Sequence, residues 1–385
     1  MTSIYFDHAA TSPMRAESLE AYLNTAGAGP SNPSSLHSFG RAARSRVTAA
    51  RDAIASLLSC SPSELVFTGG GTESDNAALV GAANAQLARG RNGIVTTAVE
   101  HHALLHTCHN LQEQGFKLTV LPVDDTGRVS VEDAAAAIDD KTAVVSVMAG
   151  NNEVGTLQPI AEIGAVARDR GAVMHVDAVQ ALGYVQLDLA NLPVDMMSLS
   201  AHKIGGPQGV GLLYIRKGTS FRPMLLGGSQ ERNRRAGTEN VAGIAAFAAA
   251  AKLAEAEREL RCRHAEELRQ SLLTELEQAI GAESFVVNGP ADSASRLPHV
   301  LNMSFPGIPS ENMLMNLDLA GVAASGGSAC TSGSLKPSHV LSAMNLSRDL
   351  VASAVRFSFG LGNTTEETKE TAKIIATISA RMRIY

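Results

Sequence analysis

Seven short apolar segments between Leu65 and Tyr214, separated by helical patterns, constrain the fold of this chain more than any other feature. The expected strands are 65–68, 93–97, 117–122, 143–148, 172–176, 196–199 and 211–215. Helical patterns, for example at 131–138 and 160–170, fill several of the gaps. This alternation predicts an α/β fold with a mostly parallel seven-stranded sheet covered by helices. Ligands of such sheets bind beyond the carboxyl ends of the strands.

A second, smaller domain is predicted after the sheet. A helical stretch over 241–279 is alanine-rich at first and charge-rich beyond Glu255. We interpret this change as a helix that leaves one core and enters the next. The later patterns are two strands and an amphipathic helix, at 299–305, 354–358 and 365–381. The predicted boundaries are 15–260 for the large domain, and 1–14 with 261–385 for the small α+β domain.

Charge and hydropathy exclude several classes of protein. The net charge of -6 is spread without long runs of one sign, so no nucleic-acid surface is expected. The first residues, Met1–Asp7, have neither the basic nor the apolar region of a signal peptide. The most apolar stretch, Val241–Ala254, contains Lys252 and falls short of a membrane span. We expect a cytoplasmic protein.

The cysteines favour no disulfide framework and no metal site. Cys60, Cys108, Cys262 and Cys330 are far apart, and no C-x-x-C pair occurs. Cys330 differs from the others because it lies in the small-residue run 325–334, which has no apolar periodicity. Glycine and serine cannot bury a thiol, so we expect an exposed thiol in a flexible loop. A chance cysteine in such a loop is the alternative.

A lysine stands where a buried strand is expected to end. Lys203 closes the run SAHK at 200–203 and is followed by a glycine-rich turn. Taking a lysine out of water is costly, and a desolvated lysine is the usual nucleophile for a Schiff base with a carbonyl cofactor. Ser200 and His202 beside it are possible phosphate donors, which makes pyridoxal phosphate the candidate cofactor. A surface lysine in a loop is the alternative.

A glycine-rich turn is a further candidate for binding the phosphate, beside Ser200 and His202. Gly69, Gly70 and Gly71 follow a predicted strand and open a helix whose amino terminus favours an anion. The turn lacks the Walker lysine and the G-x-G-x-x-G spacing, so a nucleotide site is disfavoured. We expect Gly71 and Thr72 to form a phosphate cup with Ser200 and His202.

Other polar residues follow further strands of the predicted sheet. Asp177 could meet the protonated nitrogen of a pyridine ring, with Gln180 on the same face if a helix begins there; a helix N-cap is the alternative. His101 could stack on a flat ring and move protons, or simply cap or pack. Asn152 could contact ring or substrate. Arg356, on a predicted strand, suits a substrate carboxylate or a structural salt bridge.

These motifs resemble those of the cysteine desulfurases, in the class V aminotransferase branch of the fold-type I pyridoxal phosphate enzymes. The resemblance covers nearly the whole chain and lies in the segments 4–13, 32–37, 67–76, 100–101, 151–155, 175–178, 200–203, 230–238 and 327–333. The last two, QERNRRAGT and GSACTSG, discriminate best, because many relatives share the lysine and the aspartate.

The resemblance implies a role for each candidate residue. Lys203 would bind pyridoxal phosphate as a Schiff base and carry protons, and His101 would stack on the ring. Asp177 would pair with the ring nitrogen, with Gln180 and Asn152 near the ring oxygen. The phosphate would be held by Gly71, Thr72, Ser200 and His202, and by Thr238 from the partner subunit of a homodimer. Arg356, with Asn32 as a weaker candidate and Asn152 nearby, would hold the carboxylate of L-cysteine.

Cys330 would decide the reaction, because a desulfurase needs a nucleophile that a transaminase does not. The expected products are L-alanine and a persulfide on Cys330, which would pass sulfur to an acceptor protein. The chain ends soon after its last predicted helix, and we expect it to lack the longer tail of some scaffold-binding members. The acceptor pathway therefore stays open between iron–sulfur assembly and other thiolation. A selenocysteine lyase, another class V aminotransferase and a non-catalytic scaffold are the alternatives.

Overall fold

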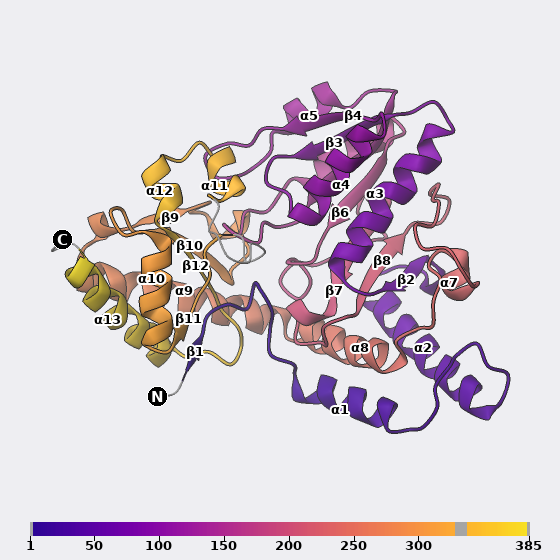
Figure 1. The fold of residues 1–385 in the computed structure, drawn as a ribbon, viewed down its shortest axis with the longest axis horizontal. Helices are drawn as coiled ribbons and strands as arrows, with labels where there is room; N and C mark the ends of the chain where they lie inside the picture. The colour runs from indigo at the N-terminus through magenta and orange to yellow at the C-terminus, as the bar shows by residue number, and fades with distance from the viewer. Residues whose placement is uncertain (1–2, 328–336, 383–385) are drawn as a thin grey trace.

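The seven predicted strands form one sheet in the computed structural model, which describes residues 3–327 and 337–382 (Figure 1). Their order across the sheet is β2-β8-β7-β6-β5-β3-β4. The strands are β2 (Leu65–Thr68), β3 (Gly93–Thr97), β4 (Lys117–Leu121), β5 (Thr142–Met148), β6 (Val173–Asp177), β7 (Met196–Ser200) and β8 (Gly211–Ile215). β8 runs antiparallel to β2 and β7, and the other neighbours are parallel. The short β7–β8 connection suits an antiparallel return.

Helices cover both faces of this sheet. They are α2 (Ser38–Leu57), α3 (Gly71–Leu87), α4 (His102–Glu113), α5 (Val131–Ala137), α6 (Ile160–Asp169) and α8 (Val241–Ala256). Neighbouring strand residues point to opposite faces. Ile94 and Val144 belong to the buried cluster of α3 and α4, whereas Val95 and Val145 belong to that of α2, α6 and α8. Burial on both faces explains why the strands read as continuous apolar runs.

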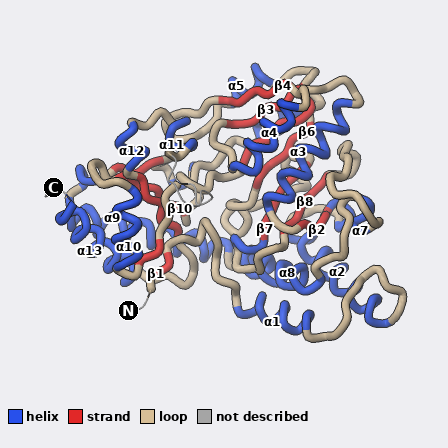
Figure 2. Tube along the Cα trace, in the orientation of Figure 1, coloured by secondary structure: helices blue, strands red, loops and turns tan. Residues whose placement is uncertain are grey.

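A second group of elements packs beside the sheet (Figure 2). It contains β1 (Ile4–Tyr5), β9 (Val286–Asn288), β10 (Val300–Ser304), β11 (Val322–Ala323), β12 (Ala354–Ser358), α9 (Arg258–Ile280), α10 (Ser310–Leu319) and α13 (Thr365–Met382). β10 pairs antiparallel with both β9 and β12. The long helical pattern breaks at Glu257, between α8 and α9, close to the predicted change at Glu255. The domain boundaries remain a prediction.

The remaining elements are short helices and turns. They are α1 (Ala16–Ala26), α7 (Gln230–Asn233), α11 (His339–Ala343), α12 (Arg348–Ala352) and four short 3-10 turns, η1 (Pro62–Glu64), η2 (Ala201–Lys203), η3 (Ala282–Ser284) and η4 (Ser293–Ser295). No helix within residues 3–327 and 337–382 is long and apolar enough to cross a membrane.

The N-terminal segment passes from one group of elements to the other. Asp7 forms a parallel bridge with Ser358 on β12. Ser12 then donates its N–H to the carbonyl of His202 at 2.9 Å, and Arg15 donates to the carbonyl of Gly205 at 2.9 Å. This segment therefore lies across the junction at which β7 ends.

A buried ion pair supports an unusual turn in α7. Glu231, Arg232 and Asn233 have φ values of 46°, 56° and 61°, which are unfavourable for residues with a side chain. The buried carboxylate of Glu231 accepts two hydrogen bonds from the Arg51 guanidinium, at 2.8 and 2.6 Å. It also accepts the N–H of Phe67 at 3.1 Å. Glu231 thereby anchors the strained turn to α2 and β2.

Replacing Arg51 by methionine should lower the free energy of unfolding by about 3–5 kcal/mol, because the Glu231 carboxylate stays buried without its partner. Urea unfolding measures this change. Arg46→Met, at a half-exposed position of the same helix, is the control and should change stability by less than about 0.5 kcal/mol. Equal stability of the two variants would contradict a role for the pair.

Candidate active site

A cavity of about 380 Å³ opens at the carboxyl ends of β2, β3, β5, β6 and β7. Most residues predicted for the site line it, namely Gly71, Thr72, His101, Asn152, Asp177, Gln180, Ser200, His202, Lys203 and Arg356. All but Arg356 lie at or just after the ends of strands that are far apart in sequence, and the large sheet brings them to one edge. Arg356 comes from β12 in the smaller group.

Three predicted residues are not among those lining this cavity. Asn32 is exposed, and its side-chain oxygen accepts the N–H of Ser34 at 2.9 Å. Its local turn therefore keeps it away from the cavity of its own chain. Thr238 is also exposed, and its predicted contact is with the cavity of a partner subunit. Cys330 lies outside the described residues, which end at Gly327 on one side and resume at Pro337.

Lys203 closes the 3-10 turn η2 directly after β7, as the sequence predicts. Its Nζ donates to the carbonyl oxygens of Ala9 and Ala10, at 2.6 and 2.8 Å. The hydroxyl of Ser12 donates to the carbonyl of Lys203 at 3.1 Å. The N-terminal segment thus places the lysine amine inside the cavity.

The residues predicted for the phosphate cup line the cavity together at the first turn of α3. The backbone of Gly71 begins this helix, and a Cβ there would lie 2.8 Å from Val179 Cγ2. The hydroxyl of Ser200 faces this turn, buried and without a hydrogen-bond partner among the described residues. Burial lowers the pKa of His202 to about 4, so its neutral ring offers one N–H. These donors and the helix dipole suit a phosphate group.

Two buried carboxyl groups share the cavity. Asp177 ends β6, and its Oδ1 accepts the N–H of Val179 at 2.9 Å. Burial raises the pKa of Asp177 to about 6. Asp75, on α3, also lines the cavity, and burial together with the nearby Asp177 raises its pKa well above the usual range. Such groups favour a cationic partner, and a protonated pyridine nitrogen is one.

Sequence reasoning missed Asp75, although a signal was present. It lies four residues after Gly71 on a predicted helix, and residues at this spacing share a helix face. The other lining residues outside the predicted set are Ala9, Ala10, His102, Met148, Gly150, Glu153, Val179 and His339.

The helix that would place Gln180 on the same face as Asp177 does not form. Residues 178–185 form turns, with the N–H of Ala181 bonded to the carbonyl of Ala178 at 3.0 Å. Gly183, at φ +80°, turns the chain before a helix can continue. Gln180 lines the cavity nevertheless, and its Nε2 donates to the carbonyl of Ala9 at 2.8 Å.

His101 caps α4 and also lines the cavity. Its Nδ1 accepts the N–H of Ala103 at 3.1 Å, which confirms the cap interpretation. Burial, reinforced by the positive charge of Lys203, lowers the pKa of His101 to about 4. At neutral pH the ring is therefore uncharged and, because Nδ1 accepts the cap bond, carries its proton on Nε2.

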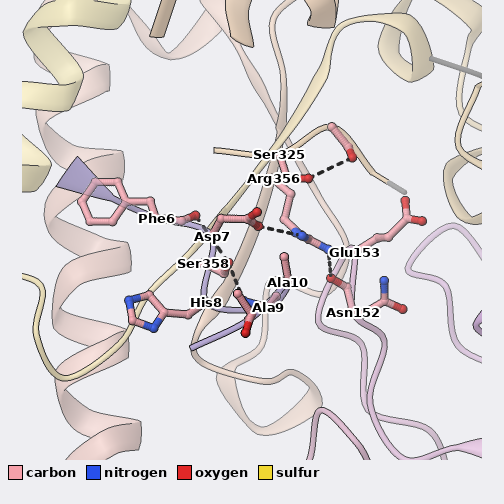
Figure 3. A network of polar contacts seen from close by, with 12 residues as sticks. Phe6, Asp7, His8, Ala9, Ala10, Asn152, Glu153, Ser325, Arg356 and Ser358 are labelled. Atoms are coloured by element: carbon pink, nitrogen blue, oxygen red, sulfur yellow. Dashed lines mark hydrogen bonds and ion pairs between the residues drawn. The ribbon is translucent and has the colours of Figure 1, made fainter. Parts of the chain in front are cut away.

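The structure shows the salt-bridge alternative for Arg356, which pairs with Asp7 (Figure 3). It lies on β12 with 2% of its surface exposed, and it lines the cavity. One Nη donates to Asp7 Oδ1 at 2.8 Å, and the other donates to the carbonyl of Asn152 at 2.9 Å. A guanidinium has five N–H groups, so these two bonds orient it and leave donors for a further carboxylate.

A scan against protein families matches residues 4–370 to the family described as aminotransferase class-V. The chain is 48% identical over 383 residues to a relative from Bacillus subtilis (strain 168), a match that covers 99% of this chain and 100% of that protein. It is 44% identical over 380 residues to the protein named cysteine desulfurase IscS from Dictyoglomus turgidum, covering 99% of this chain and 95% of the relative.

The chain is also similar to solved structures over most of its length. A NifS-like protein superposes with a TM-score of 0.91 at 36% sequence identity, covering 99% of this chain and 100% of the other. DndA from Streptomyces lividans superposes with a TM-score of 0.79 at 39% identity, covering 91% of this chain and 98% of the other.

Glu100 gives a test of the electrostatics of this site. It is fully buried, and its Oε1 accepts the Thr97 hydroxyl at 2.7 Å and the N–H of Met148 at 3.0 Å. Burial raises the pKa of Glu100 from 4.5 to about 8. The folded state therefore binds a proton that the unfolded chain releases, and the resulting stability is present below pH 4.5 and lost as the pH rises to about 8.

Glu100→Gln should remove this pH dependence. Between pH 5 and pH 8, the unfolding free energy of the wild type should fall relative to that of the variant, by about 1.4 kcal/mol per pH unit at most. Urea unfolding at several pH values measures the difference. Glu113→Gln, at the exposed end of α4, should follow the wild type. A constant difference between wild type and Glu100→Gln would contradict a raised pKa.

Proposed function

We propose that Lys203, His101 and Cys330 carry out the reaction of this chain. The chain belongs to the class V aminotransferase family and is a pyridoxal-phosphate-dependent cysteine desulfurase. L-cysteine becomes L-alanine, and its sulfur passes to Cys330 as a persulfide. The observation that best supports this assignment is the convergence of Lys203, His101, Asp177 and Arg356 on one cavity.

The residues of the cavity fit pyridoxal phosphate. The phosphate suits the first turn of α3 because the Ser200 hydroxyl there is buried without a partner among the described residues. Asp177 suits the charged ring nitrogen, and Lys203 suits the carbonyl carbon of the cofactor. The remaining proposed contacts are Gly71, Thr72 and His202 to the phosphate, Asn152 and Gln180 to the ring oxygen, and His101 to the ring face. Thr238 of the partner subunit would complete the phosphate site.

Bound pyridoxal phosphate supplies the electron sink that lets bonds at the substrate carbons break. The chain supplies the positioning and the proton carriers. Arg356, with Asn152 and Asn32 as weaker contributors, holds the substrate carboxylate. The Lys203 amine and the Nε2–H of His101 move protons at the substrate.

Cys330 provides the sulfur acceptor. A bond forms between the Cys330 sulfur and the substrate sulfur as the substrate carbon–sulfur bond breaks, and the substrate β carbon gains a proton. L-cysteine and the Cys330 thiol thus give L-alanine and the Cys330 persulfide, which balances all atoms.

The persulfide passes to an acceptor protein of iron–sulfur assembly or another thiolation pathway. We further propose a cytoplasmic homodimer. Cys60, Cys108 and Cys262 are free thiols, which suits a reducing compartment. Leu36 and Leu226 are 83% and 82% exposed, which suits burial against a second copy.

Cys330→Ala should keep the visible absorbance of the bound cofactor and lose persulfide formation from L-cysteine by more than about 1,000-fold, because it removes the nucleophile. Alanine and protein persulfide are assayed together in a single turnover. Cys262→Ala, at a half-buried thiol on α9, should match the wild type. Unchanged persulfide formation in Cys330→Ala would overturn the assignment.

Arg356→Lys should raise the KM for L-cysteine about 10- to 100-fold with a smaller effect on kcat, because lysine lacks the planar fork that grips a carboxylate. Steady-state kinetics measure the split. Binding of cysteamine, which has no carboxylate, should change by less than about threefold. An equal loss for cysteamine would show that Arg356 acts on the fold of the site rather than on the carboxylate.

A further inference from the structure

Glu153 is a buried acidic residue at the cavity for which the reaction above has no use. It is 1% exposed and follows β5 in the turn 151–155. Its backbone is held at two points: the side-chain oxygen of Asn151 accepts its N–H at 2.8 Å, and Asn302 Nδ2 donates to its carbonyl at 3.2 Å. The carboxyl group therefore extends from a well-defined anchor.

Two described residues that flank segment 328–336, Gly327 and Ser338, lie against this carboxyl group. Ser338, just after the segment, donates its hydroxyl to Glu153 Oε2 at 2.5 Å. Gly327, just before it, lies so close that an added Cβ would stand 2.5 Å from the same oxygen and 3.0 Å from Ser338 Cβ. The φ of Gly327 is not in the left-handed region. Proximity to Glu153 and Ser338, rather than backbone conformation, therefore requires glycine here.

The two flanks of the segment belong to different parts of the fold. On one side, Ser325 exchanges backbone hydrogen bonds with Arg356 of β12, at 2.7 and 3.1 Å. On the other side, Ser338 caps α11, whose Val340 and Leu341 are buried in the core cluster of the large sheet. Glu153 lies where the chain passes from one part to the other.

The groups around Glu153 affect the pKa of its carboxyl group. Burial raises its pKa, while the Ser338 hydroxyl and the nearby Arg356 act in the opposite direction. Buried carboxyl groups are rare unless they have partners, and Figure 3 shows Glu153 and Asn152 on one side of the Arg356 guanidinium with Asp7 on the other.

We propose that Glu153 is a positioning residue: its carboxyl group binds the Ser338 hydroxyl, packs against Gly327, and so fixes the two described residues that flank the segment containing Cys330. We call this pair of contacts the tie. The inference rests on the proposed role of Cys330 as sulfur acceptor. It separates two parts of the reaction: cofactor and substrate binding do not depend on the tie, whereas sulfur transfer to Cys330 does.

The test uses the cofactor-loaded enzyme and two readouts. Glu153→Gln and Ser338→Ala should each slow persulfide formation in a single turnover about 10- to 100-fold, the usual effect of a small misplacement of reacting groups. Cofactor affinity and the spectral change on adding L-cysteine should stay within about twofold of the wild type. Ser342→Ala removes a hydroxyl that donates to the Ser338 carbonyl on the exposed side of α11, and it should match the wild type.

Two double variants distinguish loss of the tie from a general disruption of the local fold. Ser338 also caps α11, so Ser338→Ala alone could act through the helix. If the pair acts as one unit, Glu153→Gln with Ser338→Ala should be no slower than the slower single variant. Gly327→Ala should slow sulfur transfer, and Glu153→Asp, which shortens the acid, should restore part of the rate in combination. Additive losses in both pairs would overturn the tie.

The outcomes also distinguish this inference from the proposed function. Persulfide formation by Cys330→Ala would contradict the proposed function itself. If Cys330→Ala is inactive while Glu153→Gln transfers sulfur at the wild-type rate, the function stands and the positioning role of Glu153 is wrong. Equal slowing of the spectral change and of sulfur transfer would place Glu153 in the substrate site, which also contradicts the inference.

Discussion

The parallel alignment of β5, β6 and β7 is the constraint on which the rest of the structure depends. It places Met148 beside Asp177 and Asp177 beside Ser198, so the turns that follow these strands leave the sheet at one edge. Each strand is buried along its whole length. The turns are therefore carried on a rigid support, and polar side chains from distant parts of the sequence meet in one cavity.

The cavity is completed by segments outside the sheet. The carbonyl of Ala9 accepts hydrogen bonds from both Lys203 and Gln180, and Asp7 pairs with Arg356. The N-terminal segment therefore links the lysine turn of the large sheet to the arginine strand of the smaller group. Glu153 makes a similar link at segment 328–336, through Gly327 and Ser338. The site depends on the relative placement of both groups of elements.

Sequence patterns predicted the seven strands of the large sheet and most of the residues that line the cavity, because both depend on local rules. Apolar runs mark buried strands, and a polar residue after such a run marks the functional edge of the sheet. Lys203 and Asp177 are found in this way. The patterns did not predict Asp7 or Glu153, because their partners are more than 150 residues away. The sequence left open whether a helix begins near Gln180, and none does, because Gly183 turns the chain.

The most direct measurement follows the sulfur atom itself. The wild-type enzyme is mixed with L-cysteine labelled with a heavy sulfur isotope, and its peptides are analysed by mass spectrometry under non-reducing conditions. The account predicts labelled sulfur on Cys330, formed together with L-alanine, and none on Cys60, Cys108 or Cys262. Formation of L-alanine with label on another cysteine, or only as free sulfide in the absence of a reductant, would contradict it.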